Sequence, residues 1–318
     1  MRWNRNVLRV AMTALLVACV HTPKTASASP PPTGHRLIRL LERVGTTRPM
    51  LIPRTAWVYI PASYSNATAP VSLIVNFHGD GSSGRRQEAR SRMSATADLQ
   101  PSDEVFLVAY PNANSVDENG RLKWNDDATS RAGIEDRKFI YDLVTTLETD
   151  YPKLDRTRVY ATGMSNGGGM TNRVGCDMAD TFAAIAPVEG GYADWAQCNP
   201  TQHISVMAFH GVTDHVVPYC GGMGAGPAAG CGPFPCIPEW AATWANRDSC
   251  DANPGELTVL LQLTPVTAIT RQEWTHCADD ASVVLYAIDP HNHTWPDPTV
   301  IDANEKMWEF FRAHPKQP

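Results

Sequence analysis

The feature that most constrains this chain is a serine flanked by glycines, Gly-Met-Ser-Asn-Gly at residues 163–167. A β-branched run enters it and a helix-like stretch leaves it, which is the context that this motif requires in hydrolases. The chain must turn sharply there from strand to helix, so glycine on either side avoids a clash. The turn would lift the Ser165 hydroxyl above a sheet, beside a helix N-terminus that favours developing negative charge. We therefore predict that Ser165 is a catalytic nucleophile.

The rest of the chain alternates strand-like and helix-like segments, which predicts the α/β class. The expected strands are Trp57–Ile60, Ser72–Phe77, Val105–Tyr110, Arg158–Gly163, Ala183–Val188, Ser205–Phe209 and Val283–Ile288. The expected helices are Glu135–Thr149, Asn166–Asp177, Pro238–Asn246 and Asn304–Ala313. The apolar, non-alternating run at 72–77 is typical of a strand covered on both faces. We expect a mostly parallel central sheet with helices on both faces, and Trp240 and Trp244 in the core or a pocket wall.

A nucleophilic serine needs a base and an orienting acid, which follow it in the order acid and then histidine in hydrolases with this turn. Asp214 comes directly after a buried strand, and Asp289 is the competing acid. His291 and His293 follow the last strand, so either can lie over the site. The other downstream histidines are His215, His276 and His314, of which His215 and His314 are interpreted as solvated or capping residues.

An acyl-transfer site also needs two donors for the oxyanion. One is the backbone N–H of the residue after the nucleophile, Asn166. The loop after an early strand supplies the second, for which we predict the Asp80 N–H, with Gly79 as the alternative. The same loop matches G-x-G-x-x-G at residues 79–84, with Asp98 further on, as in dinucleotide sites. The N-terminus and the cysteines, described below, predict export, and an exported chain is a poor setting for an enzyme with a nicotinamide cofactor. We therefore expect no cofactor.

The composition and the N-terminus limit where the chain can be located and which partners it can bind. The chain has 318 residues and a formal net charge of −6, so it lacks the basic excess of a nucleic-acid binder. Its apolar content of 43% excludes a disordered chain. Arg2, Arg5 and Arg9 precede an apolar run at 10–20, too short to span a bilayer and typical of an export signal. Cleavage falls either before a lipidated Cys19 or after a small-x-small site at 26–28. We predict an export signal and Pro-rich linker at 1–32 and one catalytic domain at 33–318.

Seven further cysteines agree with an oxidising compartment. An odd number leaves at least one without an intrachain partner inside the domain. Cys231 and Cys236 have no second pair at zinc-site spacing, and the His291 to His293 pattern has no third ligand nearby, so we expect no metal. Cys220 and Cys236 bound a Gly- and Pro-rich loop, which is typical of a functional or flexible segment.

Several motifs together carry a family resemblance: His-Gly at 78–79, Trp-Asn-Asp-Asp at 124–127, Val-Tyr-Ala-Thr-Gly-Met-Ser-Asn-Gly-Gly at 159–168, His-Gly at 210–211 with Asp214 and Val-Pro-Tyr at 217–219, and His-Thr-Trp-Pro at 293–296. They span about Thr55 to His314. The chain resembles the secreted feruloyl esterase and poly(3-hydroxybutyrate) depolymerase-like branch of the α/β-hydrolases.

The resemblance implies Ser165 as nucleophile, Asp214 as acid and His293, rather than His291, as base. It also implies the disulfides Cys250–Cys277 and Cys176–Cys198, and one local bridge among Cys220, Cys231 and Cys236. The family's usual glycines before the catalytic histidine are replaced here by His291 and Asn292, and the loop at 220–236 is expanded. Both departures bear on substrate preference.

The expected activity is ester hydrolysis through an acyl-enzyme, on feruloyl or acetyl esters of polysaccharide or on polyhydroxyalkanoate-type esters. Trp124, Tyr219 and Trp295 are candidates for lining the substrate pocket, with a structural role equally open for each. A serine peptidase or amidase of the same fold is the first alternative. A non-catalytic polymer-binding relative is the second. Whether the chain is lipidated, its natural ester and its oligomeric state stay open at this stage.

Overall fold

The computed structural model describes residues 33–44, 50–116, 120–126, 135–192, 197–220, 235–255, 257–264 and 267–317. These residues all belong to one compact unit, Pro31–Pro318. The predicted export signal, with Cys19 and the cleavage site at 26–28, lies outside the described residues. Within the described ranges, no helix combines the length and apolar character that a bilayer crossing requires.

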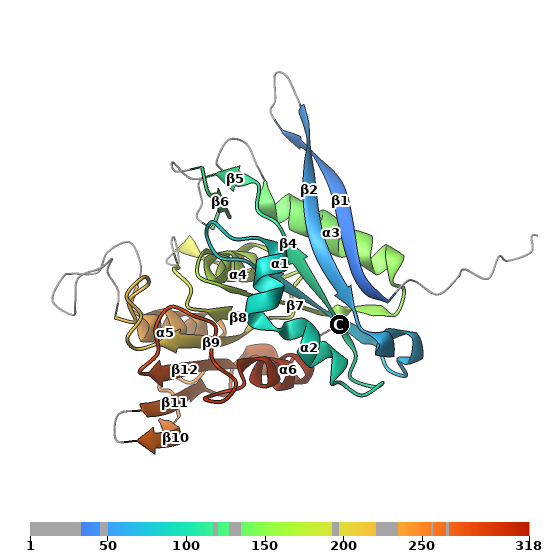
Figure 1. The fold of residues 1–318 in the computed structure, drawn as a ribbon. Coiled ribbons are helices and arrows are strands. Elements are labelled where there is room, and N and C mark those ends of the chain that lie inside the picture. Colours follow the sequence, from blue (N-terminus) through green and yellow to red (C-terminus); the bar gives the residue numbers. More distant parts are fainter. Residues whose placement is uncertain are drawn as a thin grey trace, which may run out of the picture. The chain divides into compact units, whose positions relative to one another are not determined.

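A ten-stranded sheet organises the described part of the chain (Figure 1). Its order is β1-β2-β4-β3-β7-β8-β9-β12-β11-β10. The strands are β1 (Gly34–Val44), β2 (Met50–Ile60), β3 (Val71–Phe77), β4 (Phe106–Pro111), β7 (Leu154–Met164), β8 (Ala184–Val188), β9 (Ser205–Gly211), β10 (Thr258–Thr264), β11 (Thr267–Trp274) and β12 (Val283–Asp289). A separate small pair joins β5 (Ser115–Val116) to β6 (Leu122–Lys123).

The centre of this sheet is parallel, from β4 through β3, β7, β8 and β9 to β12. Antiparallel strands flank it, with β2 and β1 on one side and β11 and β10 on the other. Each predicted strand has a counterpart, and the sequence segment at 57–60 is the end of the longer β2. The sequence interpretation missed β1, β10 and β11. In β1 the side chains are mostly exposed or half-buried, so it lacks the continuous apolar run by which the central strands were recognised.

The helices are α1 (Gly84–Ser91), α2 (Met93–Asp98), α3 (Asp136–Asp150), α4 (Asn166–Asp177), α5 (Ile237–Arg247) and α6 (Ala303–Ala313). Apolar side chains of α3, α4 and α5 pack in one cluster with Leu73, Val75 and Phe77 of β3. Those of α2 and α6 pack in a second cluster with Ile74 of the same strand. Because successive side chains of a strand face opposite ways, helices cover both faces of the sheet, as expected.

Two of these helices, α1 and α2, were not predicted. The sequence of α1 is Gly-Arg-Arg-Gln-Glu-Ala-Arg-Ser, which offers no apolar stripe for a periodicity argument. The four expected helices are present, and α4 has the predicted bounds. Trp240 and Trp244 are fully buried, and both indole N–H groups donate to the side-chain oxygen of Asn172 in α4. They belong to the core.

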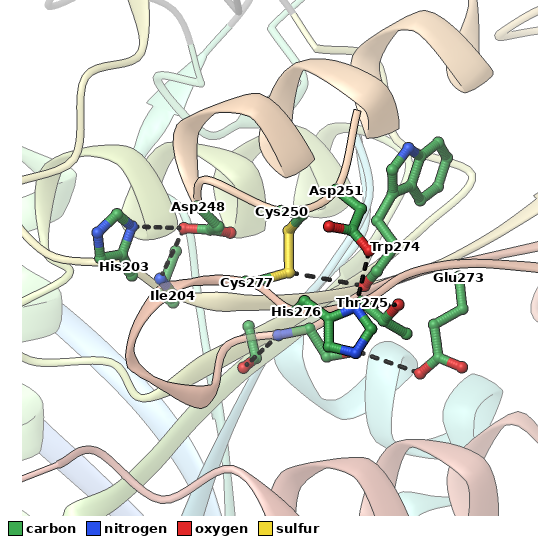
Figure 2. The surroundings of a disulfide bond; sticks show 12 residues. His203, Ile204, Asp248, Cys250, Asp251, Glu273, Trp274, Thr275, His276 and Cys277 are labelled. Atoms are coloured by element: carbon green, nitrogen blue, oxygen red, sulfur yellow. Dashed lines mark hydrogen bonds and ion pairs between the residues drawn. A yellow bond between two sulfur atoms is a disulfide. The ribbon is translucent and has the colours of Figure 1, made fainter. Parts of the chain in front are cut away.

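Both disulfides implied by the resemblance are confirmed, Cys176–Cys198 and Cys250–Cys277. The second ties the segment after α5 to the segment after β11 (Figure 2). Nearby, Asp248 at the end of α5 accepts a hydrogen bond from the backbone N–H of Ile204 at 3.1 Å. The expected local bridge among the remaining cysteines falls on a segment of which residues 221–234, including Cys231, lie outside the described residues.

A buried charge cluster connects β1, β2 and α3 next to the loop at 124–126. The Arg54 guanidinium, fully buried, lies 2.5 Å from a carboxylate oxygen of Glu42 and 2.5 Å from one of Asp136. Asp136 also accepts the backbone N–H of Asn125 at 2.9 Å. The ring of Phe139 packs 4.1 Å below the guanidinium. The cluster therefore holds the start of α3 and the loop at 124–126 against the sheet.

Replacing Arg54 by methionine should destabilise the protein by about 3–5 kcal/mol, because it leaves two carboxylates buried without their cation. Urea unfolding at neutral pH measures the loss. The matched control is Arg137→Met, which removes an exposed ion pair to Asp177 and should cost less than about 1 kcal/mol. Equal losses in the two variants would contradict the importance given to the buried cluster.

Candidate active site

Ser165 occupies the turn between β7 and α4 in a backbone conformation that is rare for a residue with a side chain, at φ 59° and ψ −123°. Its N–H donates to the carbonyl oxygen of Val188 at 3.0 Å. A Cβ atom at Gly163 would lie 2.5 Å from the Gly167 carbonyl oxygen, and one at Gly167 would lie 2.2 Å from that of Phe77. These contacts are with backbone that cannot move aside, so the strained turn requires both glycines, as the motif predicts.

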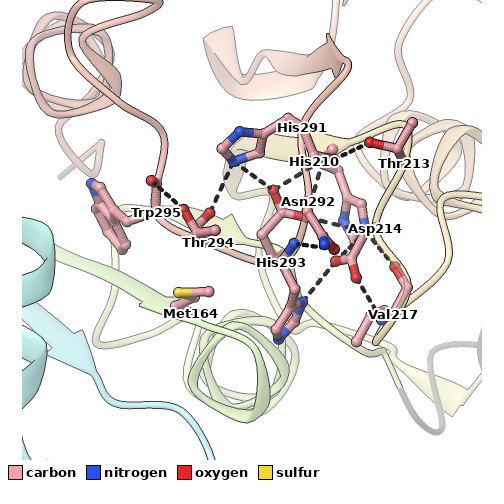
Figure 3. A network of polar contacts seen from close by, with 12 residues as sticks. Met164, His210, Thr213, Asp214, Val217, His291, Asn292, His293, Thr294 and Trp295 are labelled. Atoms are coloured by element: carbon pink, nitrogen blue, oxygen red, sulfur yellow. Dashed lines mark hydrogen bonds and ion pairs between the residues drawn. The ribbon is translucent and has the colours of Figure 1, made fainter.

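Asp214 and His293 meet at the same edge of the sheet. They follow β9 and β12, which are parallel neighbours, and Ser165 follows β7, which is parallel and lies two strands from β9. His293 Nδ1 lies 2.7 Å from Asp214 Oδ2, and Figure 3 shows the two side chains pointing toward each other. The other carboxylate oxygen, Oδ1, accepts the N–H groups of Val216 and Val217 at 2.7 and 2.9 Å.

This arrangement sets the charge of Asp214 and the tautomer of a neutral His293. Burial raises the pKa of the Asp214 carboxyl, but hydrogen bonds from His293, Glu189 and Val217 outweigh it and lower that pKa to about 2. Asp214 is therefore a carboxylate throughout the neutral range, and it accepts the proton on Nδ1 of His293. The unprotonated Nε2 of His293 is then the atom available as a base.

The competing residues have other partners. His291 Nε2 donates to the Thr294 carbonyl oxygen at 3.0 Å, within its own loop (Figure 3). Among the described residues, Asp289 makes no hydrogen bond or ion pair with a histidine. The geometry therefore favours Asp214 and His293 over Asp289 and His291, and their catalytic roles stay predictions.

The remaining downstream histidines lie apart from this pair. His215 is exposed, and its backbone N–H donates to Asn292. His276 pairs with Asp251 on the surface (Figure 2). His314 bonds to the carbonyl oxygen of Phe310 in α6.

The loop after β3 passes directly alongside Ser165. A Cβ atom at Gly79 would lie 3.3 Å from the Ser165 Cβ and 3.9 Å from its Oγ, so a side chain there would crowd the nucleophile. His78 Nε2 accepts the backbone N–H of Ala113 at 3.0 Å, so its Nδ1 carries the proton and donates to the Gly79 carbonyl oxygen at 2.7 Å. Burial lowers the pKa of His78, in keeping with this neutral form.

That hydrogen bond orients the peptide between Gly79 and Asp80. The C=O and N–H of a trans peptide point in opposite directions, so the Asp80 N–H points away from the His78 ring. Within the part of the chain that the structure describes, neither the Asp80 N–H nor the Asn166 N–H donates to a protein acceptor. Both predicted oxyanion donors are therefore available to a ligand, and their role stays a prediction.

Replacing His78 by leucine should lower kcat for an ester by about 10- to 100-fold and leave KM within about threefold. The reason is that the predicted second oxyanion donor, the Asp80 N–H, loses its orientation, which costs less than the 10²- to 10³-fold of losing a donor outright. Steady-state kinetics below the melting temperature of the variant, with His276→Leu as a surface control, measure the effect. A rise in KM with unchanged kcat would contradict it.

The three candidates for lining the substrate pocket are placed differently. Trp124 is fully buried, and its indole N–H donates to the His78 carbonyl oxygen at 2.9 Å, while its backbone N–H donates to the Asn166 side chain at 2.8 Å. Trp295 is buried and bonded to α6 through Asn304. Tyr219 is half-buried. The contacts of Trp124 favour a structural role, in which it supports the two segments that carry the predicted oxyanion donors. Substrate contact by any of the three residues stays a prediction.

The sequence interpretation missed Glu189. This residue follows β8, is fully buried, and lies with His210 and Asp214 so that one polar atom of each is within 4.8 Å of the others. Three such side chains are a grouping that could hold a metal ion. The available sequence signal was an acid placed between a buried apolar strand and the glycines at 190 and 191.

A separate cavity of about 880 Å³ lies at the opposite end of the parallel strands. Thr157, Ala183 and Ser205 line it, at or next to the beginnings of β7, β8 and β9, together with the cations Arg156 and Lys316. Its lining includes none of the three predicted catalytic residues.

No family model matches the chain. The chain is 27% identical over 209 residues to feruloyl esterase B of Piromyces equi, covering 64% of this chain and 37% of that protein. It is 29% identical over 128 residues to poly(3-hydroxyalkanoate) depolymerase C of Paucimonas lemoignei, covering 40% of this chain and 30% of that protein. The chain thus spans about a third of the length of these two relatives.

Among solved structures, the acetyl xylan esterase of Aspergillus awamori superposes with a TM-score of 0.60 at 17% identity, covering 87% of this chain and 99% of that one. This likeness shows the fold alone, which is the α/β-hydrolase fold. The resemblance read from the motifs is confirmed, since the chain has feruloyl esterase and polyhydroxyalkanoate depolymerase relatives.

Proposed function

We propose that this chain, which has the α/β-hydrolase fold and esterase relatives, is an exported serine esterase that hydrolyses carboxylic esters through a Ser165–Asp214–His293 triad. The observation that carries the proposal is the 2.7 Å contact between His293 Nδ1 and Asp214 Oδ2. It lies at the sheet edge where the strained turn carries Ser165. A paired histidine and carboxylate beside a serine nucleophile is the arrangement that acyl transfer needs.

In the first half of the reaction, Nε2 of His293 takes the proton of the Ser165 hydroxyl as its oxygen attacks the ester carbon. The carbonyl oxygen becomes negatively charged and is stabilised by the N–H groups of Asn166 and Asp80. Asp214 stabilises the imidazolium while it remains ionised itself. The imidazolium then protonates the leaving alcohol, and the acyl group stays on Ser165.

In the second half, His293 takes a proton from water, and the resulting hydroxide attacks the acyl-enzyme. The same two N–H groups stabilise the second tetrahedral intermediate. Its collapse releases the carboxylic acid and returns the proton from His293 to Ser165. Each step uses only side chains and backbone donors of this chain and one water molecule.

The relatives point to the esters of plant polysaccharides and to polyhydroxyalkanoates as substrate classes. One named relative is a feruloyl esterase and another a poly(3-hydroxyalkanoate) depolymerase. Export is supported by the two disulfides, because such bonds persist in oxidising compartments. Lipidation at Cys19 remains part of the proposal as one of two processing routes.

A substrate panel tests the proposal. Purified protein is assayed on nitrophenyl acetate, methyl ferulate, acetylated xylan and hydroxybutyrate oligomers, with a nitroanilide of matched acyl group as the amide control. We expect turnover of at least one ester and covalent labelling of Ser165 by a fluorophosphonate. Faster cleavage of the anilide would instead indicate a peptidase or amidase, and the absence of labelling would indicate a non-catalytic relative.

A further inference from the structure

Glu189 is a buried acid that the proposed mechanism leaves unused. It directly follows β8 and has a φ of 48°, a left-handed conformation that is strained for a residue with a side chain. A Cβ atom at Gly168 would lie 2.7 Å from the Gly190 Cα, so the chain after Glu189 is pressed against α4. The Glu189 side chain is fully buried behind the predicted triad.

Its carboxyl group lies close to the predicted triad acid. Both carboxyl oxygens of Glu189 lie 3.0 Å from the backbone nitrogen of Gly211, and one of them lies within 4.8 Å of a carboxyl oxygen of Asp214. His210 Nε2 lies 3.5 Å from an oxygen of each acid. His291 Nε2 lies 3.4 Å from the other Glu189 oxygen.

Two carboxyl groups can share a hydrogen bond only if one of them keeps its proton or a cation lies between them. His210 is not that cation, because burial lowers its pKa to about 4. Its Nε2 already donates to the Val217 carbonyl oxygen, and its buried Nδ1 has no hydrogen-bond partner among the described residues, so the second proton of an imidazolium would be unpaired. Among the described residues, Asp214 accepts hydrogen bonds from three donors, whereas the Glu189 carboxyl accepts one within 3.0 Å only from the backbone N–H of Gly211. The proton therefore belongs to Glu189.

We infer that Glu189 is a positioning residue for the proposed esterase: as a neutral carboxylic acid it donates a hydrogen bond to Asp214 and keeps that carboxylate facing His293. The inference rests on the proposed function for its effect on turnover. It does not rest on it for the protonation of Glu189, which can be measured in any folded sample.

Electrostatics agree with the geometry. Burial, with the hydrogen bond to Asp214, raises the pKa of Glu189 well above its usual range. The titratable groups that face it are Asp214 and His210 at the end of β9, His291 after β12 and Tyr192 after β8. Among these groups, Asp214 is a carboxylate at neutral pH, because its pKa is about 2. An ionised Glu189 would add a second negative charge beside it.

The kinetic test compares Glu189→Gln with Glu189→Leu on a nitrophenyl ester across pH. Glutamine keeps a neutral donor for Asp214 and an acceptor for Gly211. The kcat of this variant should therefore stay within about fivefold of the parent, and the acidic limb of its pH–rate profile should not move. Leucine has similar bulk but no donor, so kcat should fall about 10- to 100-fold. Its acidic limb should move to higher pH, because Asp214 then concentrates more charge on His293.

A second test does not depend on activity. In the folded protein Glu189 keeps its proton, whereas in the unfolded chain the carboxyl ionises above its ordinary pKa of 4.5. Unfolding at neutral pH therefore releases that proton, and rising pH lowers the stability of the native state through this group. Glu189→Gln should release about one proton fewer, as measured from the pH dependence of urea unfolding. The control is Glu309→Gln on the exposed face of α6, which should release the same number as the parent.

The outcomes separate the two proposals. If no ester is hydrolysed but the unfolding experiment shows the missing proton, the proposed function fails and the protonated Glu189 stands. The inference is overturned if Glu189→Gln unfolds with the proton release of the parent, or if it lowers kcat as much as Glu189→Leu does. It is also overturned if the acidic limb of the pH–rate profile of Glu189→Leu moves to lower pH. A stoichiometric divalent metal in the purified protein, lost in Glu189→Gln, would also overturn it.

Discussion

Ser165→Ala is expected to lower kcat for nitrophenyl acetate by about six orders of magnitude, to the level left by binding and the oxyanion donors alone. Alanine has no oxygen to form the acyl-enzyme, and the backbone turn that places it remains. The N–H of residue 165 still donates to Val188, so the fold and the donor at Asn166 should persist. Stopped and steady-state assays at pH 8, on protein checked by circular dichroism, measure the loss.

The control is Ser65→Ala, an exposed serine after β2 whose hydroxyl bonds only to its own turn among the described residues. It should retain full activity. Unchanged turnover in Ser165→Ala would remove the serine mechanism, and an active-site fluorophosphonate should label the parent and the control but not this variant.

His293→Ala should cost nearly as much as the serine replacement, and the double variant should lose little more than either alone. The nucleophile and its base act as a unit, so once one of them is removed the other no longer contributes to catalysis. Additive losses would mean that His293 acts separately from Ser165, for instance in binding.

Asp214→Asn is expected to lower kcat by about four orders of magnitude, and the structure gives a specific reason. The N–H groups of Val216 and Val217 both point at Oδ1, so the amide oxygen of asparagine takes that place. The NH₂ group then replaces Oδ2 and faces Nδ1 of His293 as a donor. Nδ1 must accept, the imidazole proton moves to Nε2, and the base that Ser165 requires is lost.

The measurement is kcat/KM near pH 8, where the parent carboxyl, with a pKa of about 2, is fully ionised. Asp297→Asn is a matched control, because Asp297 is exposed and, among the contacts the structure describes, its side chain hydrogen-bonds only to the neighbouring Thr299. A loss smaller than about tenfold in Asp214→Asn would show that Asp214 does not set the tautomer of His293.

Local patterns predicted the parts of the fold that are encoded locally. The central strands were recognisable because continuous burial forces apolar runs such as that of β3. The edge strand β1 and the helix α1 carry charged, exposed side chains. The position of such segments depends on contacts with neighbouring strands and helices rather than on a local apolar pattern. Arg54 shows the same limit, since its two buried partners lie 12 and 82 residues away in sequence.

By itself, the sequence determined the strained serine turn, because the crowding that demands glycine at 163 and 167 arises where β7 runs into α4. It also placed Asp214 and His293 after strands, where a parallel sheet collects functional groups. The family resemblance implied which acid and histidine pair, but only the tertiary structure shows the contact, which joins residues 79 apart across two neighbouring strands. The tertiary structure alone placed Glu189 behind them, because the closeness of two buried acids after β8 and β9 depends on strand order and has no signature in sequence spacing.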